Sequence, residues 1–290
     1  MPAPRHSAAP HPAAAPASPW QPSAPCSPHS CIDAAASMAA VPLAVLRFAA
    51  VLTLMVAGSA LLPVVRRLPV APRERIIRTW SRAVVRATGV RVRITGSAPP
   101  HGGLLVVANH ISWLDIPLLA AVRPGRMLAK SDIRKWPVAG ALTALSGALF
   151  IDRNRLRALP ETVARIAGGL RAGSTVVVFP EGSTWCGRAQ GRFRPAVFQA
   201  ALDAGAPVQP VRLHYRHDGG PAGTAAAFVG SDSLLTSVWR VLTARGLVAE
   251  VWVTPVLAPG SAPDRRGLAL AAQRAVESAK NARQDPYACL

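Results

Sequence analysis

The stretch "VVANHISWLDIP", Val106–Pro117, contains the change from strand to helix that decides the fold. Its first residues are apolar and β-branched, a pattern typical of a buried strand. Asn109 and His110 follow at the end of this run, and Asp115 begins a second apolar stretch. In α/β folds, the loops that leave the carboxyl ends of strands carry functional residues. The stretch therefore predicts a histidine and a carboxylate in a strand-to-helix turn.

Strand and helix patterns alternate along the rest of the chain. We expect strands at 90–94, 104–107, 148–151, 175–179, 208–215 and 247–255, and helices at 116–122, 136–145, 159–172, 196–204, 234–244 and 268–280. This alternation is typical of an α/β domain with a mostly parallel sheet flanked by helices. We assign 73–262 to this domain and 263–290 to a C-terminal helix and tail.

Two segments precede the predicted domain. Residues 1–36 are rich in Pro, Ala, Ser and His, so we expect a disordered leader. Residues 37–72 are predicted to form a membrane anchor, because Phe48–Val65 is uncharged and approaches the roughly 20 residues that a span requires. The arginine pair that follows favours a cytoplasmic domain. A true span, a re-entrant hairpin bent near Pro63 and a buried core helix all fit this pattern.

The formal charge of +19 indicates an anionic partner, either a membrane surface or a nucleic acid. Arginine supplies nearly all of this charge, and compositional bias accounts for part of it. No nucleic-acid motif is present, so we expect an anionic membrane surface and no nucleic acid. Apolar residues at helical spacing within 73–89, with arginines opposite, predict a basic amphipathic helix that either lies on lipid or covers the sheet.

The four cysteines, Cys26, Cys31, Cys186 and Cys289, include no Cys-x-x-Cys pair. Their spacing predicts neither a disulfide framework nor a zinc site, and a reducing compartment is the default. No His-Glu-x-x-His or comparable ligand set is present, so we expect no metal.

Two further predicted strands end in unusual sequences. One ends in "FIDR", 150–153, and the other in "FPEGS", 179–183. Each sequence alone is compatible with a cap, a salt bridge or a turn. Together with His110 and Asp115, they put several ionisable side chains at neighbouring strand ends. The three sequences therefore predict one site at this edge of the sheet.

These sequences resemble the glycerolipid acyltransferase family, in particular the lysophosphatidate (1-acyl-sn-glycerol-3-phosphate) acyltransferases. "NHISWLD" (109–115), "GALFIDR" (147–153), most of "FPEGS" (179–183) and "APVQPV" (206–211) match its four blocks in order and spacing. The resemblance covers roughly 90–256. It implies an enzyme of phospholipid biosynthesis at the cell membrane. Such an enzyme transfers a fatty acyl group from acyl-CoA or acyl carrier protein to the hydroxyl of a lysolipid, most often lysophosphatidate.

The chemistry gives the two catalytic candidates distinct roles. An alcohol is a poor nucleophile at neutral pH, and His110 is suited to act as its general base. A carboxylate from Asp115 on the other ring nitrogen would fix the tautomer and stabilise the imidazolium. Side chains five residues apart on one helix diverge, so we expect His110 in the turn and Asp115 at the helix start. Ser112 is interpreted as a turn residue, because Gly-x-Ser-x-Gly is absent.

The resemblance also implies substrate-binding residues. It assigns Arg153 to an anionic headgroup or a donor phosphate, which suits a guanidinium. It assigns Glu181 and Gly182 to the acceptor, and Asn109 and Ser183 belong to the same blocks. A structural role for Glu181 as the partner of an arginine stays open.

The third block departs from the family at Thr184, where the family carries an arginine tied to the acceptor phosphate. Arg188, Arg192 or Arg194 would have to supply that charge. The departure also resembles relatives that acylate lyso-ornithine lipid, which we keep as the alternative acceptor. Two other functions stay open: a basic protein that binds anionic lipid or nucleic acid, and a thioesterase-like hydrolase that uses the same His and Asp on water.

Overall fold

The computed structural model describes residues 22–32, 40–99, 102–135, 140, 143, 146–152, 155–218, 220 and 222–279. These residues form a seven-stranded sheet with the order β1-β7-β6-β2-β5-β3-β4. The strands are β1 Arg91–Thr95, β2 Leu104–Ala108, β3 Arg126–Lys130, β4 Leu149–Ile151, β5 Thr175–Val178, β6 Val208–His217 and β7 Leu247–Val253. Neighbouring strands are parallel except β6 and β7, so the predicted mostly parallel α/β sheet is confirmed.

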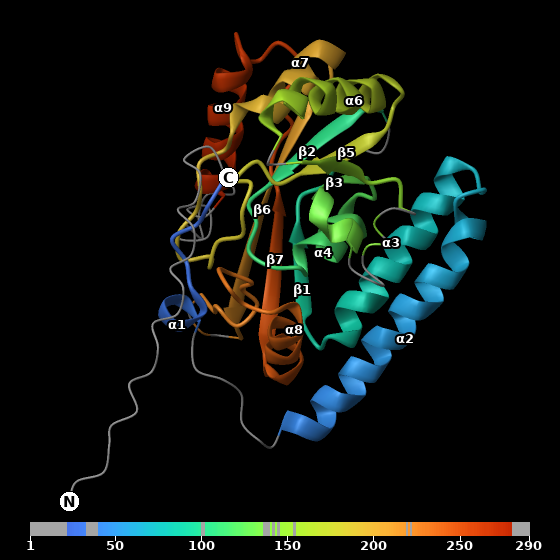
Figure 1. Ribbon diagram of the computed structural model, residues 1–290, viewed down its shortest axis with the longest axis vertical. Helices are drawn as coiled ribbons and strands as arrows, with labels where there is room; N and C mark the ends of the chain where they lie inside the picture. The colour runs from blue at the N-terminus through green and yellow to red at the C-terminus, as the bar shows by residue number, and fades with distance from the viewer. Residues whose placement is uncertain are drawn as a thin grey trace, which may run out of the picture.

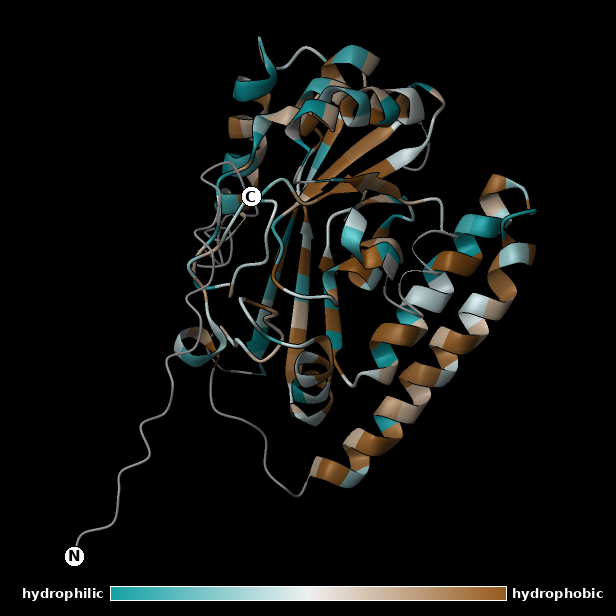
Figure 2. Ribbon diagram, in the orientation of Figure 1, coloured by the Kyte–Doolittle hydropathy of each residue, from teal (hydrophilic) through white to brown (hydrophobic). Residues whose placement is uncertain are grey.

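Helices cover both faces of the sheet (Figure 1). One face carries α3 (Val70–Ala87), α4 (Asp115–Val122) and α8 (Leu234–Thr243), and the other carries α6 (Leu159–Arg171), α7 (Phe198–Ala204) and α9 (Arg265–Ser278). Short 3-10 helices lie at Ser131–Lys135, Leu156–Ala158 and Pro195–Val197. The alternate side chains of β2 enter two separate apolar clusters, one on each face. Because both faces are covered, β2 is apolar throughout and wholly buried (Figure 2).

One strand at the β3–β4 edge of the sheet differs from the predicted elements, and one predicted helix is not tested. The sequence pattern missed β3, "RMLAK", which has three apolar residues between two cations and is held by pairing with β4 and β5. The predicted helix 136–145 falls outside the described residues apart from Gly140 and Thr143.

Residues 22–32 of the predicted leader belong to the described part of the chain. This segment contains the one-turn helix α1, Pro28–Cys31, whose N-cap Ser27 accepts a hydrogen bond from the Ser30 amide. Cys26 is buried in the same apolar cluster as β2. Helix α1 lies on the side of the domain away from α2 (Figure 1). Tertiary contacts therefore order a stretch whose composition predicts disorder. Residues 1–21 and 33–36 of the predicted leader lie outside the described residues.

The predicted anchor contains α2, Val41–Val65, a helix of 25 residues that is long and apolar enough to cross a membrane. It packs along α3, where Nε1 of Trp80 donates to the carbonyl of Leu54 at 2.9 Å. At its other end, Arg47 donates to the carbonyl of Leu242 at the end of α8. The outer face of α2 is exposed and apolar, so α2 is not a buried core helix.

Candidate active site

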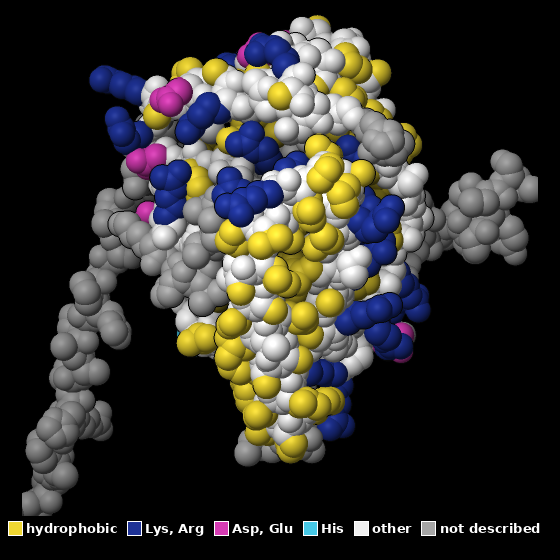
Figure 3. Space-filling view, turned by 90° about the vertical axis from the view of Figure 1, so that its right-hand side faces the viewer, with side chains coloured by type: hydrophobic (Ala, Val, Ile, Leu, Met, Phe, Trp, Pro, Cys, Tyr) yellow, Lys and Arg dark blue, Asp and Glu magenta, His cyan; other side chains and the backbone are white. Residues whose placement is uncertain are grey.

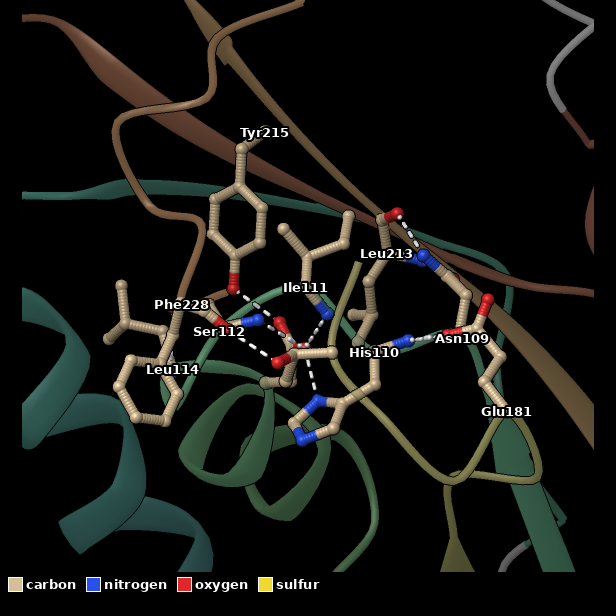
Figure 4. Close-up of polar contacts among 11 residues, drawn as sticks. Asn109, His110, Ile111, Ser112, Leu114, Glu181, Leu213, Tyr215 and Phe228 are labelled. Atoms are coloured by element: carbon tan, nitrogen blue, oxygen red, sulfur yellow. Dashed lines mark hydrogen bonds and ion pairs between the residues drawn. The ribbon is translucent and has the colours of Figure 1, made fainter. Parts of the chain in front are cut away.

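The site lies where β2 ends and α4 begins. Nδ1 of His110 is 2.8 Å from Oδ2 of Asp115. His110 lies in the turn and Asp115 is the first residue of α4, as predicted. The carboxylate is fully buried, whereas the imidazole is 20% exposed. Nε2 of His110 points away from Asp115 (Figure 4). The pair thus has the arrangement of a general base supported by a carboxylate.

The Asp115 carboxylate has a full set of donors. Its Oδ2 also accepts the backbone N–H groups of Ile111 and Ser112, at 2.7 and 2.8 Å. Its Oδ1 accepts the hydroxyl of Tyr215, from β6, at 2.6 Å. A buried carboxylate is tolerated when such donors surround it. The residues around the turn therefore hold a carboxylate in place for the imidazole.

Two contacts from the segment after β5 hold His110, one on its imidazole and one on its backbone. Phe179, just after β5, stacks on it with ring centroids 3.9 Å apart and an interplanar angle of 10°. The backbone N–H of Trp185 donates to the carbonyl oxygen of His110 at 2.8 Å. The "FPEGS" loop thus packs directly on the turn that carries His110, and the predicted meeting of these two strand ends is found.

The side chains of Asn109 and Glu181 form hydrogen bonds with backbone groups around the turn. The Asn109 side chain is buried and exchanges two hydrogen bonds with the backbone of Leu213, at 2.9 and 2.8 Å, which join β2 to β6. Glu181 is 4% exposed and accepts the amides of His110 at 2.7 Å and Gly191 at 3.0 Å. Burial outweighs these donors and raises the pKa of Glu181 to about 8. The contacts of both residues favour a positioning role over the substrate contact implied by the resemblance.

Gly182, Ser183 and Arg153 are the other predicted site residues, and Ser112 is the predicted turn residue. Gly182 has a φ of +74°, which favours glycine, and Ser183 follows it, partly exposed, in the same turn. Ser112 is buried, and its Oγ accepts the amide of Leu114, so its interpretation as a turn residue is confirmed. Arg153 lies outside the described residues.

The sequence that forms this site is similar to known proteins. A model of the acyltransferase family matches residues 89–214. The chain is 40% identical over 210 residues to the lyso-ornithine lipid O-acyltransferase of Pseudomonas aeruginosa, covering 71% of this chain and 79% of that protein. The chain belongs to the acyltransferase family. It is also 35% identical over 197 residues to the 1-acyl-sn-glycerol-3-phosphate acyltransferase of Neisseria meningitidis, covering 68% of this chain and 77% of that protein.

A solved structure supports the fold of this acyltransferase. The 1-acyl-sn-glycerophosphate acyltransferase PlsC of Thermotoga maritima superposes with a TM-score of 0.63 at 19% identity, covering 86% of this chain and 98% of that one. At this identity the likeness concerns the fold, including the helical segment that precedes the sheet.

The third block of this acyltransferase has a threonine, Thr184, where the family carries an arginine. The Thr184 hydroxyl donates to the backbone carbonyl of Phe228, so the side chain that replaces the family's arginine is directed at a neighbouring loop. Among the three candidate replacements, Arg194 lies beside the turn: its backbone N–H donates to the Pro180 carbonyl at 3.0 Å, and its side chain passes close to Gly182.

Sequence reasoning missed Tyr215 as a member of the acyltransferase site. Tyr215 is 100 residues from Asp115 in the chain. Its one sequence signal is alternation along β6, where Val211, Leu213 and Tyr215 share a buried face. A phenol among such residues needs a hydrogen-bond partner, and pairing of β6 with β2 brings it to Asp115.

Proposed function

We propose that this acyltransferase moves a fatty acyl group from a thioester to the hydroxyl of a membrane lysolipid. The observation that carries the proposal is the His110–Asp115 pair, with Nδ1 on a buried carboxylate and Nε2 directed away from it. Membership of the acyltransferase family supports the same reaction class.

In the mechanism we propose, Nε2 of His110 accepts the proton of the acceptor hydroxyl as its oxygen attacks the thioester carbonyl. Asp115 stabilises the imidazolium that forms. The tetrahedral intermediate then collapses, the carbon–sulfur bond breaks, and the imidazolium returns the proton to the departing thiolate. The products are an ester and a free thiol, and the steps call for neither a metal nor another cofactor.

The surrounding residues are proposed to hold this geometry. Asn109 ties the end of β2 to β6, and Glu181 holds the His110 amide from below. Both are positioning residues in this scheme. Gly182 and Ser183, in the partly exposed turn that follows Phe179, are the proposed acceptor contacts. We propose that Arg153 binds the acceptor headgroup or a phosphate of the acyl donor.

Lysophosphatidate is our first proposal for the acceptor. Arg194 lies beside the Gly182 turn, where a guanidinium suits phosphate oxygens. Lyso-ornithine lipid is the second candidate. Thr184 supports it, because this residue replaces an arginine with a hydroxyl that contacts backbone. The Pseudomonas aeruginosa relative named for that acceptor supports it as well. The donor is acyl-CoA or acyl carrier protein in either case.

The enzyme is membrane-associated, and we propose that α2 and α3 attach it to the cytoplasmic face. Figure 3 shows apolar side chains gathered down this side of the molecule with Lys and Arg side chains beside them. The apolar set lies on α2 and includes Leu43, Leu46, Phe48, Leu52, Val56, Leu61 and Val64. Contacts of α2 with α3 and α8 hold it against the domain, which favours attachment to one leaflet over a span. An anionic surface would suit the flanking arginines.

A lipid-product assay tests the proposal. Membranes that contain the protein or its His110→Ala variant receive labelled acyl-CoA or acyl carrier protein, with lysophosphatidate or lyso-ornithine lipid as acceptor. His110-dependent phosphatidate would support the first acceptor, and ornithine lipid the second. Free fatty acid without acylated lipid would show that the protein is a thioesterase-like hydrolase and not a transferase.

A further inference from the structure

Three of the four cysteines converge in space although they are scattered in the sequence. The Sγ atoms of Cys26, Cys31 and Cys186 all lie within 4.8 Å of one another, and none of the three forms a disulfide. Cys26 and Cys186 are 7% and 4% exposed, and Cys31 is half-buried. The sequence spacing predicts no metal site, because the third thiol is more than 150 residues from the other two.

Local structure directs these thiols toward each other. Helix α1 makes a single turn between Cys26 and Cys31, closed by a bond from the Cys31 amide to the Ser27 carbonyl at 3.1 Å. This turn brings both cysteines to the loop that carries Cys186. Residues 22–32 are also docked at two further points: Pro22 fills the space beside Gly182, and the Cys26 carbonyl lies close to Gly230.

We propose that Cys26, Cys31 and Cys186 form a zinc site that fastens the N-terminal segment to the loop beside the catalytic histidine. An all-sulfur set selects thiophilic ions and excludes Mg²⁺ and Ca²⁺. Zinc–sulfur bonds of about 2.3 Å place thiolates about 3.8–4.0 Å apart, so the three atoms need to close by less than about 1 Å. A disulfide would use two of the thiols and leave the third buried and unused.

The three ligand atoms lie together in a mostly buried site, in which Cys26 and Cys186 are shielded from solvent. A bound Zn²⁺ stabilises the thiolate form, and binding releases the thiol protons. The half-buried Cys31 leaves one side of the cluster toward solvent, where the ion enters and a water completes four-coordination.

The residues on either side of Cys186 contact the turn that carries His110. Trp185 precedes Cys186 and donates its backbone N–H to the carbonyl of His110 at 2.8 Å. Gly187, on the other side, lies against Ile111 of the catalytic turn. A metal on Cys186 would therefore fix the loop that packs on the general base. The site does not depend on which lysolipid is the acceptor.

Metal titration of the full-length protein in detergent tests the proposal. The reduced, metal-free protein is titrated with Co²⁺ and then with Zn²⁺. We expect about one equivalent bound, thiolate-to-cobalt charge-transfer absorption, and displacement of that absorption by zinc. Single Cys26→Ser, Cys31→Ser and Cys186→Ser variants should each lose the stoichiometric ion. The matched control Cys289→Ser, which removes the fourth cysteine, should keep it.

Hydrogen exchange of wild-type protein provides a readout that needs no substitution. Zinc should slow amide exchange in residues 22–32 at least about tenfold, as expected if the ion closes local opening of the segment. Absence of cobalt thiolate absorption in the reduced wild type, or its persistence in Cys186→Ser, would overturn the site. Protein purified without reductant could contain a disulfide among the three cysteines and bind no metal after reduction. That result would show a redox pair in place of the zinc site.

Discussion

Tyr215 donates its hydroxyl to Oδ1 of Asp115 at 2.6 Å, while Oδ2 of the same carboxylate lies 2.8 Å from His110. Burial and the Asp115 charge hold the pKa of Tyr215 well above its usual range, so the phenol stays a donor throughout the working pH range. Tyr215, from β6, is thus a third member of the His110–Asp115 arrangement. In the mechanism we propose, Tyr215 acts on catalysis through the carboxylate.

Tyr215→Phe should therefore weaken the enzyme without abolishing it. Loss of a buried hydrogen bond to a charged group costs about 1.5–3 kcal/mol of stability. We expect a lower melting temperature and a fall in kcat of about tenfold, which corresponds to roughly 1.4 kcal/mol in the barrier. The matched control is Tyr287→Phe, the other tyrosine of the chain. Unchanged melting temperature and kcat in Tyr215→Phe would exclude this role.

His110→Ala should lower kcat by about 10² to 10⁴, the usual contribution of a positioned general base. Lipid-product rates at saturating substrates measure it. His217→Ala is the matched control, because His217 is partly exposed and contacts the Arg245 carbonyl away from the site. Near-normal turnover in His110→Ala would contradict the mechanism.

Asp115→Asn should keep the fold and lose rate. The amide oxygen can accept the three N–H groups that meet Oδ2, and the amide nitrogen can face Tyr215. The negative charge that stabilises the imidazolium is gone, so kcat should fall while the circular dichroism spectrum is retained. Full activity in this variant would show that the negative charge of Asp115 is not needed for the reaction.

The strand-to-turn-to-helix unit around His110 could be predicted from sequence because its signals are local. A buried strand, a polar turn and an apolar helix follow each other within 20 residues, and the pairing of His110 with Asp115 depends on that stretch alone. The parallel sheet follows from the same alternation of strands and helices.

The features that sequence reasoning missed depend on distant contacts. Strand β3 is too short and charged to be predicted without its partners β4 and β5. The contact of Tyr215 with Asp115 requires the placement of β6 beside β2. The docking of residues 22–32, and with it the thiol cluster, comes from a loop that lies about 160 residues further along the chain. Composition and periodicity contain no information about such pairings.

Glu181 should give the enzyme a specific pH dependence of stability. Its pKa of about 8 lies above the usual 4.5, so the folded protein holds this proton more tightly than the unfolded chain. The resulting stability is complete below about pH 4.5 and is lost as the pH rises toward 8. Melting temperatures from pH 5 to 8.5 should decline more steeply in wild type than in Glu181→Gln. Glu161→Gln, at an exposed position on α6, is the control, and parallel curves for wild type and Glu181→Gln would refute the shift.

Arg194→Ala distinguishes the two acceptors. If Arg194 binds the phosphate of lysophosphatidate, its loss should raise KM for that acceptor about tenfold or more and change kcat little. Arg171→Ala is the matched control, because Arg171 is an exposed arginine at the end of α6 that donates to the Asp203 carbonyl. Equal kinetics of the two variants with lysophosphatidate would remove Arg194 from the headgroup site and favour the ornithine acceptor.

Val56→Asp tests the attachment surface on α2. Val56 is 56% exposed on the apolar face of the helix. A charged residue in the hydrocarbon region costs about 2.5–3.5 kcal/mol, so partition into vesicles that contain anionic lipid should fall at least tenfold. Leu270→Asp, at a 49% exposed position on α9 on the other side of the domain, is the control. Wild-type protein should also bind these vesicles more weakly at high salt, because the arginines beside α2 contribute through screened charge. Equal vesicle binding by the two variants would mean that α2 is not the surface that meets the membrane.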